Sequence, residues 1–303
     1  MPDVGDSSEK NHLGYFQFNC AKFIAIFKDS QIFNCRKHFM PSVQVGDLTM
    51  NYTVKGEGDW LVMVGGYASG NWSSWGPQLD LASQQFKVLA FDNRGIGGTD
   101  APDTPYTTQM LAKDALGLMQ VLGISRAHVM GKSLGGAIAQ WMTILQPDIV
   151  RSLAMTSTFS HLGPRGRHMV EWWLASAKAT GINRCFIAGL LTYFYSERYC
   201  ALNQEKIEKS VESMLQVNRP LHGYLHTGHS LLTHDSRDRL CEIQCPTQIL
   251  IGQNDIITTL EHSQEIGQLI PHSEVLIFED TLHGFMAERP DAFNSILQFF
   301  ARN

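Results

Sequence analysis

The sequence has no long apolar segment and no excess of positive charge. No run of about 18 apolar residues without a charge occurs in the 303 residues, so no membrane-spanning helix is expected. The formal net charge is −5, and we therefore expect no general affinity for nucleic acid or for an anionic membrane surface. Internal repeats and low-complexity tracts are also missing, which argues against a repeat architecture.

Cysteine is sparse and lacks a metal-binding pattern. The six cysteines are scattered, and Cys241 and Cys245 have no second pair at zinc-finger spacing. We interpret them as free thiols of a reducing compartment and expect a cytoplasmic protein. Residues 1–39 lack the basic start, the clean apolar run and the small-residue cleavage site of a secretory signal. We treat them as an N-terminal extension of unassigned role and expect the folded part to begin near Met40.

Short apolar runs alternate with helical segments along the rest of the chain. A strand that is apolar throughout is typical of a sheet covered on both faces, and alternating strands and helices favour a mostly parallel sheet. We therefore predict an α/β fold with helices on both faces of the sheet. A hairpin of two strands is expected at about 43–54, because Gly46-Asp47 is a turn signal. Further strands are expected at about 60–64, 86–91, 127–130, 152–156, 247–251 and 274–278, and a final helix at about 290–300.

The strand pattern stops between Phe159 and about Asp235. This stretch has helical character and is rich in aromatic residues. We predict that residues 159–235 form a helical cap inserted after the sixth strand, and that residues 40–158 and 236–303 form the core.

The segment Gly131-Lys132-Ser133-Leu134-Gly135 has the pattern G-x-S-x-G. An expected strand precedes it and an expected helix follows it, which is the context of a nucleophile elbow. The glycines allow strand and helix to approach closely. Ser133 would lie at the start of the helix, where backbone N–H groups face developing negative charge. Ser133 is therefore the candidate nucleophile.

A serine hydroxyl is a weak nucleophile that needs a base, and the base needs an orienting carboxylate. The chain order at such an elbow is Ser, acid, His. His283 follows the last expected strand and is the candidate base. Asp255 directly follows the preceding strand and is the candidate acid, with Asp280 as the alternative.

An oxyanion hole needs two backbone N–H groups. One is expected from Leu134, the residue after the nucleophile. We assign the other to Tyr67, because Gly65-Gly66 before it allows a sharp turn.

From about Val43 to Arg302 the chain resembles the α/β-hydrolase superfamily, and within it the enol-lactonase and non-haem haloperoxidase-like esterases. It departs from the usual His-Gly of the oxyanion loop, where it has Gly65-Gly66. The resemblance depends on the elbow and on Asp92-Asn93-Arg94-Gly95-x-Gly97-x-x-Asp100, His234-Asp235-x-Arg237-Asp238, Gly252-x-x-Asp255 and His283-Gly284-Phe285-x-x-x-Glu288-x-Pro290.

The residues and the resemblance together imply a serine hydrolase that cleaves a carboxylic ester or a lactone through an acyl-enzyme, without cofactor or metal. An aromatic cap favours a largely apolar substrate, of the enol-lactone or the macrocyclic lactone class (as in macrolide esterases). Arg165, Arg167 and Arg184 could instead face a substrate carboxylate. The expected substrate contacts are Trp72, Trp75, Trp172, Trp173, Phe194 and Tyr195.

Several alternatives stay open. The same three side chains serve carbon–carbon bond hydrolases and perhydrolases, and some members of this fold are non-catalytic ligand receptors. His222, His226 and His229 could share a helical face and suggest zinc, but no carboxylate or cysteine completes the set at a useful spacing. The expected partner is a small-molecule substrate, and the sequence does not determine the oligomeric state.

Overall fold

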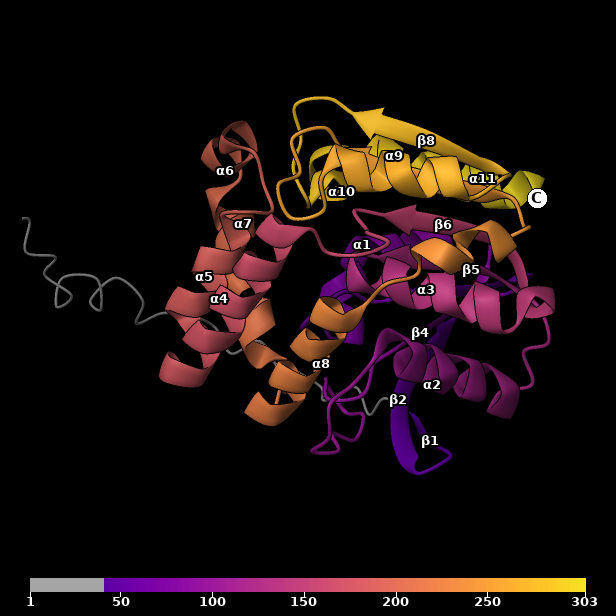
Figure 1. Cartoon of the computed structure of the whole chain (residues 1–303), viewed down its shortest axis with the longest axis horizontal. Coiled ribbons are helices and arrows are strands. Elements are labelled where there is room, and N and C mark those ends of the chain that lie inside the picture. Colours follow the sequence, from indigo (N-terminus) through magenta and orange to yellow (C-terminus); the bar gives the residue numbers. More distant parts are fainter. Residues whose placement is uncertain (1–40) are drawn as a thin grey trace, which may run out of the picture. The chain divides into compact units, whose positions relative to one another are not determined.

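The structure is a computed structural model that describes residues 41–303, with the side chains of residues 71–74 left out. The N-terminal extension predicted for residues 1–39 therefore lies outside the described residues. Figure 1 shows the described part as a twisted sheet with helices packed along it and a group of helices at one side.

The described strands form one eight-stranded sheet in the order β1-β2-β4-β3-β5-β6-β7-β8. The pairs β1–β2 and β2–β4 are antiparallel, and all other pairs are parallel. The bounds are Ser42–Val45 (β1), Leu48–Lys55 (β2), Trp60–Val64 (β3), Lys87–Phe91 (β4), Ala127–Lys132 (β5), Val150–Thr156 (β6), Thr247–Gly252 (β7) and Ser273–Phe278 (β8). This confirms the predicted mostly parallel α/β sheet.

Helices cover both faces of the sheet, and this explains why its central strands are apolar throughout. Along β3, Val62 and Val64 pack into one hydrophobic cluster, whereas Leu61 and Met63 pack into the other. The alternation follows from the two-residue period of a strand. The first cluster includes side chains of α2 (Thr108–Val121), α3 (Leu134–Leu145) and α9 (Leu260–Leu269), and the second includes side chains of α1 (Asn71–Ala82) and α11 (Pro290–Arg302).

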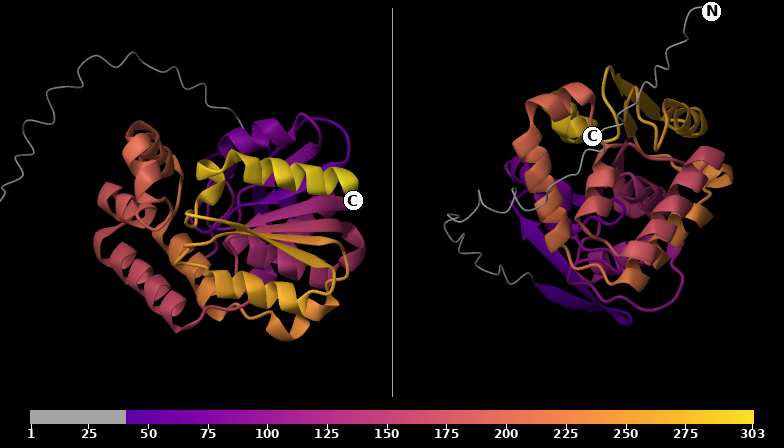
Figure 2. Two further views of the ribbon diagram at one scale, coloured as in Figure 1. Left: turned by 90° about the horizontal axis from the view of Figure 1, so that it is seen from above. Right: turned by 90° about the vertical axis from the view of Figure 1, so that its left-hand side faces the viewer.

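Five helices lie between β6 and β7, within the segment predicted as a cap; we call α4 to α8 the helical insert. They are α4 (Pro164–Thr180), α5 (Arg184–Leu191), α6 (Glu197–Leu202), α7 (Gln204–Gln216) and α8 (Leu221–Thr233). The left view of Figure 2 shows them grouped at one side of the sheet. The segments that flank the insert meet, because His161 before α4 and Asp235 after α8 form an isolated antiparallel β-bridge. The division of the chain into a core and a separate cap stays a prediction.

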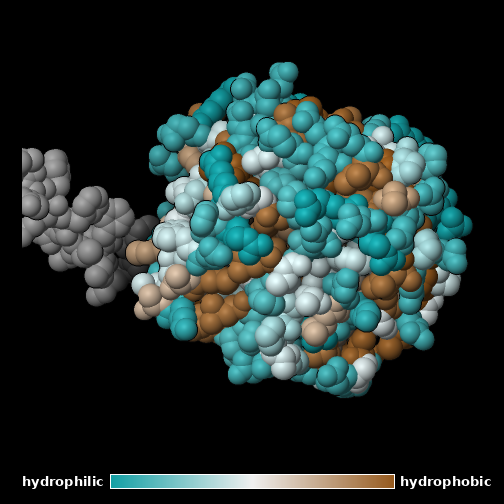
Figure 3. Space-filling view, viewed as in Figure 1, coloured by the Kyte–Doolittle hydropathy of each residue, from teal (hydrophilic) through white to brown (hydrophobic). Residues whose placement is uncertain are grey.

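Apolar side chains also reach the surface. Figure 3 shows a mostly hydrophilic face with an apolar patch over the helices of the insert. Within the described residues, no helix combines the length and the apolar character that crossing a bilayer requires.

Two histidines are buried in the core of the fold. His128 lies in β5, where its Nδ1 is 2.8 Å from Ser152 Oγ. His234 follows α8, and its Nδ1 is 2.9 Å from Thr108 Oγ1. Burial lowers the pKa of His128 to about 4 and that of His234 to about 3, because a buried imidazolium loses its hydration.

His128 and His234 should make folding sensitive to mild acid. Their pKa values are lowered in the folded state, so the unfolded chain takes up protons first as the pH falls below about 6.5. Each histidine should cost up to about 2 kcal/mol of unfolding free energy between pH 7 and pH 5. We expect His234→Gln to lose about that much less stability than the wild type over this interval, as measured by denaturant unfolding at both pH values. The exposed His168 provides the control, because His168→Gln should follow the wild-type curve. Equal losses in His234→Gln and wild type would contradict the assignment.

Candidate active site

Ser133 lies at the sharp turn between β5 and α3. Its backbone has φ 55° and ψ −120°, a region that a residue with a side chain rarely adopts. The Ser133 N–H donates to Thr156 O at 2.8 Å, and Thr158 Oγ1 donates to Ser133 O at 2.8 Å. These two bonds to the end of β6 and the residues after it hold the strained turn in place.

The turn is tight because two glycines let the helix lie against the strands. A Cβ on Gly131 would lie 2.3 Å from Gly135 O, and a Cβ on Gly135 would lie 2.0 Å from Val64 O. Both separations are far below contact distance. A side chain at either position would therefore push α3 away from β3 and β5.

His283 and Asp255 form a buried pair at the same end of the sheet. His283 Nδ1 lies 2.7 Å from Asp255 Oδ2, and both residues are at most 6% exposed. Asp255 follows β7 and His283 follows β8, so the neighbouring parallel strands bring them together. The alternative acid, Asp280, is exposed in the turn after β8.

The Asp255 carboxylate is also held by its own loop. Oδ1 accepts hydrogen bonds from the backbone N–H groups of Ile257 and Thr258, at 2.8 and 3.0 Å. Thr258 Oγ1 lies 2.9 Å from Asp255 Oδ2 and 3.3 Å from His283 Nδ1. These hydrogen bonds fix the position of the carboxylate, so the loop orients Asp255 toward the imidazole. Sequence reasoning missed Thr258, although its position three residues after the acid is typical of a side chain in an Asx-type turn.

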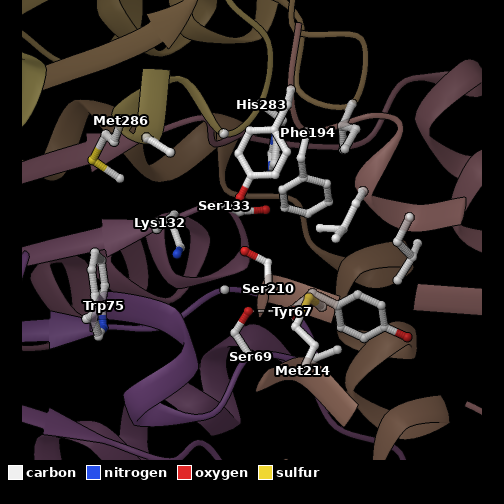
Figure 4. A pocket seen from close by; sticks show the side chains of 18 of the residues that line it. Tyr67, Ser69, Trp75, Lys132, Ser133, Phe194, Ser210, Met214, His283 and Met286 are labelled. Carbon is white, nitrogen blue, oxygen red and sulfur yellow. Dashed lines mark hydrogen bonds between the residues drawn. The ribbon is translucent and has the colours of Figure 1, made fainter. Parts of the chain in front are cut away.

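Ser133 and His283 line one pocket of about 590 Å³, most of whose lining is apolar. Figure 4 shows this pocket with Ser133 and His283 among the labelled side chains. The ring of Phe194, from the segment after α5, lies edge-on to the His283 ring at 5.1 Å between centroids. Gly284 N donates to Phe194 O at 2.7 Å. The insert therefore packs directly on the loop that carries His283.

The loop after β3 passes over the elbow, as expected for an oxyanion loop. A Cβ on Gly66 would lie 3.4 Å from the Cβ of Ser133. The backbone N–H groups of Tyr67 and Leu134 make no hydrogen bond to any other described residue. The N–H groups of both residues can thus donate a hydrogen bond to an oxygen of a ligand.

The insert fixes this loop from the other side. Tyr67 Oη donates to Tyr224 O at 3.1 Å, and its ring stacks on Trp173. Arg219 Nε donates to Ala68 O at 2.6 Å. No sequence pattern indicated Arg219 or Tyr224, because their contacts join segments that lie 151 and 157 positions apart.

Four of the six predicted substrate contacts line the pocket. They are Trp75, Trp173, Phe194 and Tyr195. Trp172 differs from the expectation, because its side chain is 53% exposed and is not part of the described lining. Adjacent helix residues point about 100° apart, so α4 turns Trp173 inward and Trp172 outward. The side chain of Trp72 lies outside the described residues.

The three arginines considered for a substrate carboxylate are not part of the described lining either. Arg184 pairs with Glu208 and Glu212 on α7, and Arg167 donates to Leu232 O at 3.0 Å. Two of the histidines considered for zinc also have other contacts. His222 Nε2 lies 2.8 Å from Ala101 O, and His226 Nε2 lies 2.7 Å from Asp103 Oδ1.

Comparison with known proteins finds a family model that matches most of the chain. The family model of the alpha/beta hydrolase fold matches residues 59–290. The 3-oxoadipate enol-lactonase 1 of Acinetobacter baylyi is 27% identical over 231 residues, which cover 76% of this chain and 84% of that protein.

Solved structures are similar over most of the chain. The enol-lactonase from Burkholderia xenovorans LB400 matches with a TM-score of 0.80 and 25% identity, covering 87% of this chain and 100% of that chain. A thermophilic esterase from Thermogutta terrifontis matches with a TM-score of 0.77, covering 87% of this chain and 98% of that one. Its 22% identity indicates the shared fold alone.

The close approach at the elbow predicts opposite effects for two glycine substitutions. Gly135→Ala should destabilise the fold by at least about 3 kcal/mol, because its Cβ would overlap a backbone carbonyl that cannot move freely. Gly189→Ala is the matched control, since Gly189 lies in α5 with no atom near an added Cβ. This variant should gain roughly 0.5–1 kcal/mol from helix propensity. Denaturant unfolding measures both, and a Gly135→Ala protein of wild-type stability would contradict the packing at the elbow.

Proposed function

The chain belongs to the α/β hydrolase fold family, and on this premise we propose that it hydrolyses a carboxylic ester or a lactone through an acyl-enzyme on Ser133. The observation that carries the proposal is the buried contact of 2.7 Å between His283 Nδ1 and Asp255 Oδ2. His283 lines the same pocket as Ser133. A neutral imidazole oriented by a carboxylate is the base that a serine hydroxyl needs.

Ser133, His283 and Asp255 each have one role in the proposed reaction. Ser133 Oγ attacks the carbonyl carbon while His283 Nε2 takes its proton, since Nδ1 is engaged by Asp255. His283 then gives that proton to the leaving alcohol oxygen. A water molecule attacks the acyl-enzyme, again with His283 as the base, and the acid is released from Ser133. Asp255 keeps the imidazole in one orientation and stabilises its charged form.

The backbone N–H groups of Tyr67 and Leu134 complete the proposed machinery. Two such donors would bind the oxygen that becomes negative when the carbonyl is attacked, and one donor of this kind is worth about 10²–10³ in rate in other enzymes. Their freedom from other described partners supports this role. Arg219 and Tyr224 act on the same loop as positioning residues, because they bind it and not the substrate.

The substrate class follows from the pocket and from the relatives. The apolar lining supports a largely apolar ester or lactone, and the relatives named above include enol-lactonases. A macrocyclic lactone stays a prediction. The alternative activities of this set of side chains, carbon–carbon bond hydrolysis and perhydrolysis, would use the same Ser133. None of these reactions requires a cofactor.

Ser133→Ala tests the nucleophile directly. We expect kcat for a simple 4-nitrophenyl ester to fall on the order of 10⁶-fold, as in other serine hydrolases, and covalent labelling by a fluorophosphonate to disappear. Ser213 also lines the pocket, and Ser213→Ala should still be labelled. Labelling that persists in Ser133→Ala would contradict the assignment, and a wild-type protein that is never labelled would favour a non-catalytic receptor.

The neighbouring tryptophans of α4 test whether the insert selects the substrate. Trp173→Phe removes part of a ring from the pocket wall, so kcat/KM for a bulky ester relative to an acetyl ester should rise by about threefold to tenfold. Trp172→Phe makes the same chemical change on the exposed side of the helix and should leave this ratio as in the wild type. If both variants lose thermal stability and neither changes the ratio, Trp173 only holds the insert together.

A further inference from the structure

Strained backbone positions are concentrated at the proposed site. The residues other than glycine that have a positive φ in the described part of the chain are Ala68, Ser133, Ser157 and Asp280. Ala68 belongs to the loop after β3 and Ser133 is the elbow itself, while Asp280 is exposed in a turn. Such strain persists where the surroundings fix the backbone, and it clusters at functional sites. Ser157, directly after β6, has φ 46° and is fully buried, yet the proposed reaction gives it no role.

The hydroxyl of Ser157 holds the backbone that carries the proposed base. Ser157 Oγ donates to His283 O at 2.9 Å, and no other described group hydrogen-bonds to that carbonyl. Ser157 N donates to Leu250 O in β7 at 3.0 Å, so the residue is also fixed to the strand that precedes Asp255. Glycine would adopt this φ at less cost, but it has no hydroxyl to donate. The strain therefore accompanies a hydrogen bond that only a side chain can make.

The next residue, Thr158, holds the proposed nucleophile. Its Oγ1 donates to Ser133 O at 2.8 Å. Two successive side chains after β6 thus bind the backbones of Ser133, which follows β5, and of His283, which follows β8. Strand β6 lies between β5 and β7 in the sheet and leads to none of the proposed catalytic side chains. The segment after it is therefore placed to act as a spacer between the nucleophile and the base.

We propose that Ser157 and Thr158 are positioning residues that set the separation between the Ser133 hydroxyl and the His283 imidazole. The inference rests on the proposed function, because it assumes that His283 takes the proton of Ser133. Neither positioning residue is part of the described pocket lining. Proton transfer needs heavy atoms about 2.6–3.2 Å apart, and a misplacement of about 1 Å can lower a rate by about 10²-fold. Loss of either hydrogen bond should therefore slow the chemistry and leave substrate binding unchanged.

Ser157→Ala tests the contact with His283. We expect kcat for 4-nitrophenyl butanoate to fall about 10- to 100-fold while KM stays within about threefold of the wild-type value. Ser230 provides the control, because it is equally buried and its hydroxyl also donates to a backbone carbonyl, Thr227 O, at 2.6 Å. Ser230→Ala should keep both kcat and KM within about threefold of wild type. A similarly small change of kcat in Ser157→Ala would overturn the proposal.

Ser157→Gly separates the position of His283 from the stability of the fold. Glycine removes the same hydroxyl but relieves the positive φ, so this variant should melt about 2 °C above Ser157→Ala. Both variants should nevertheless lose kcat to the same extent. If kcat instead follows the melting temperature, with Ser157→Gly close to the wild type, Ser157 only stabilises its loop and the proposal is overturned.

Two substitutions of Thr158 test the contact with Ser133. Thr158→Val keeps the shape of the side chain and removes the hydrogen bond, so kcat should fall about tenfold. Thr158→Ser keeps the hydroxyl and should keep most of the activity. Thr143→Val is the control, because Thr143 Oγ1 donates to Ala139 O at 2.9 Å within α3 and outside the described lining. Equal activity of the Val and Ser variants at position 158 would overturn this part of the proposal.

Removing the base gives the sharpest test. In a His283→Ala background, Ser157→Ala should lower the residual kcat by less than about threefold, because residues that act as one unit are not additive. A further loss of about tenfold would mean that Ser157 acts on the fold instead of on His283, and would overturn the proposal. If a fluorophosphonate labels Ser133 while Ser157→Ala keeps its kcat, only this inference fails. If wild-type Ser133 is never labelled, the proposed function fails and this inference fails with it.

Discussion

The close contact between the start of α3 and the strands β3 and β5 is the constraint on which the site depends. With no room for a side chain at Gly131 or Gly135, the backbone has to turn within a single residue, and Ser133 takes a positive φ as a result. That turn sends the hydroxyl to the carboxyl end of the sheet and leaves the Leu134 N–H pointing out of the helix start. It also places Lys132, the last residue of β5, at the wall of the pocket.

The parallel sheet brings the remaining groups to this turn. Ser133, Asp255 and His283 follow strands β5, β7 and β8, which lie on one side of the sheet order with only β6 between them. Since all four strands are parallel, their carboxyl ends share one edge, which is where ligands bind in open α/β sheets. The separation of 122 positions between Ser133 and Asp255 is thus no obstacle to their meeting at one edge of the sheet.

The helical insert contributes to the site at this edge in two ways. Its aromatic side chains form much of the pocket wall, and its polar groups bind the loops beneath. Arg219 holds the loop after β3, while Glu288, after His283, accepts a hydrogen bond from Ser196 N at 2.9 Å. A change in the insert can therefore alter both the shape of the pocket and the position of the groups below it. Substitutions that touch neither loop, such as those at Trp172, separate these two effects.

The sequence by itself determined the α/β fold and, within it, the order of apolar strands and the strand–turn–helix context of Ser133. These features depend on local rules: the spacing of apolar residues and the backbone freedom of glycine. The pairing of Asp255 with His283 could also be anticipated, because each directly follows a strand. Their chemical roles stay predictions.

Only the tertiary structure decided which other side chains share the pocket. Trp172 and Trp173 are equivalent in sequence, and the packing of α4 alone chose between them. Arg165, Arg167 and Arg184 looked able to meet a substrate carboxylate, yet none of them is part of the described lining, whereas Lys132 from the motif itself is. The physical reason is that a pocket is formed by segments far apart in the chain. The direction of a side chain then depends on how whole elements pack, which local spacing does not encode.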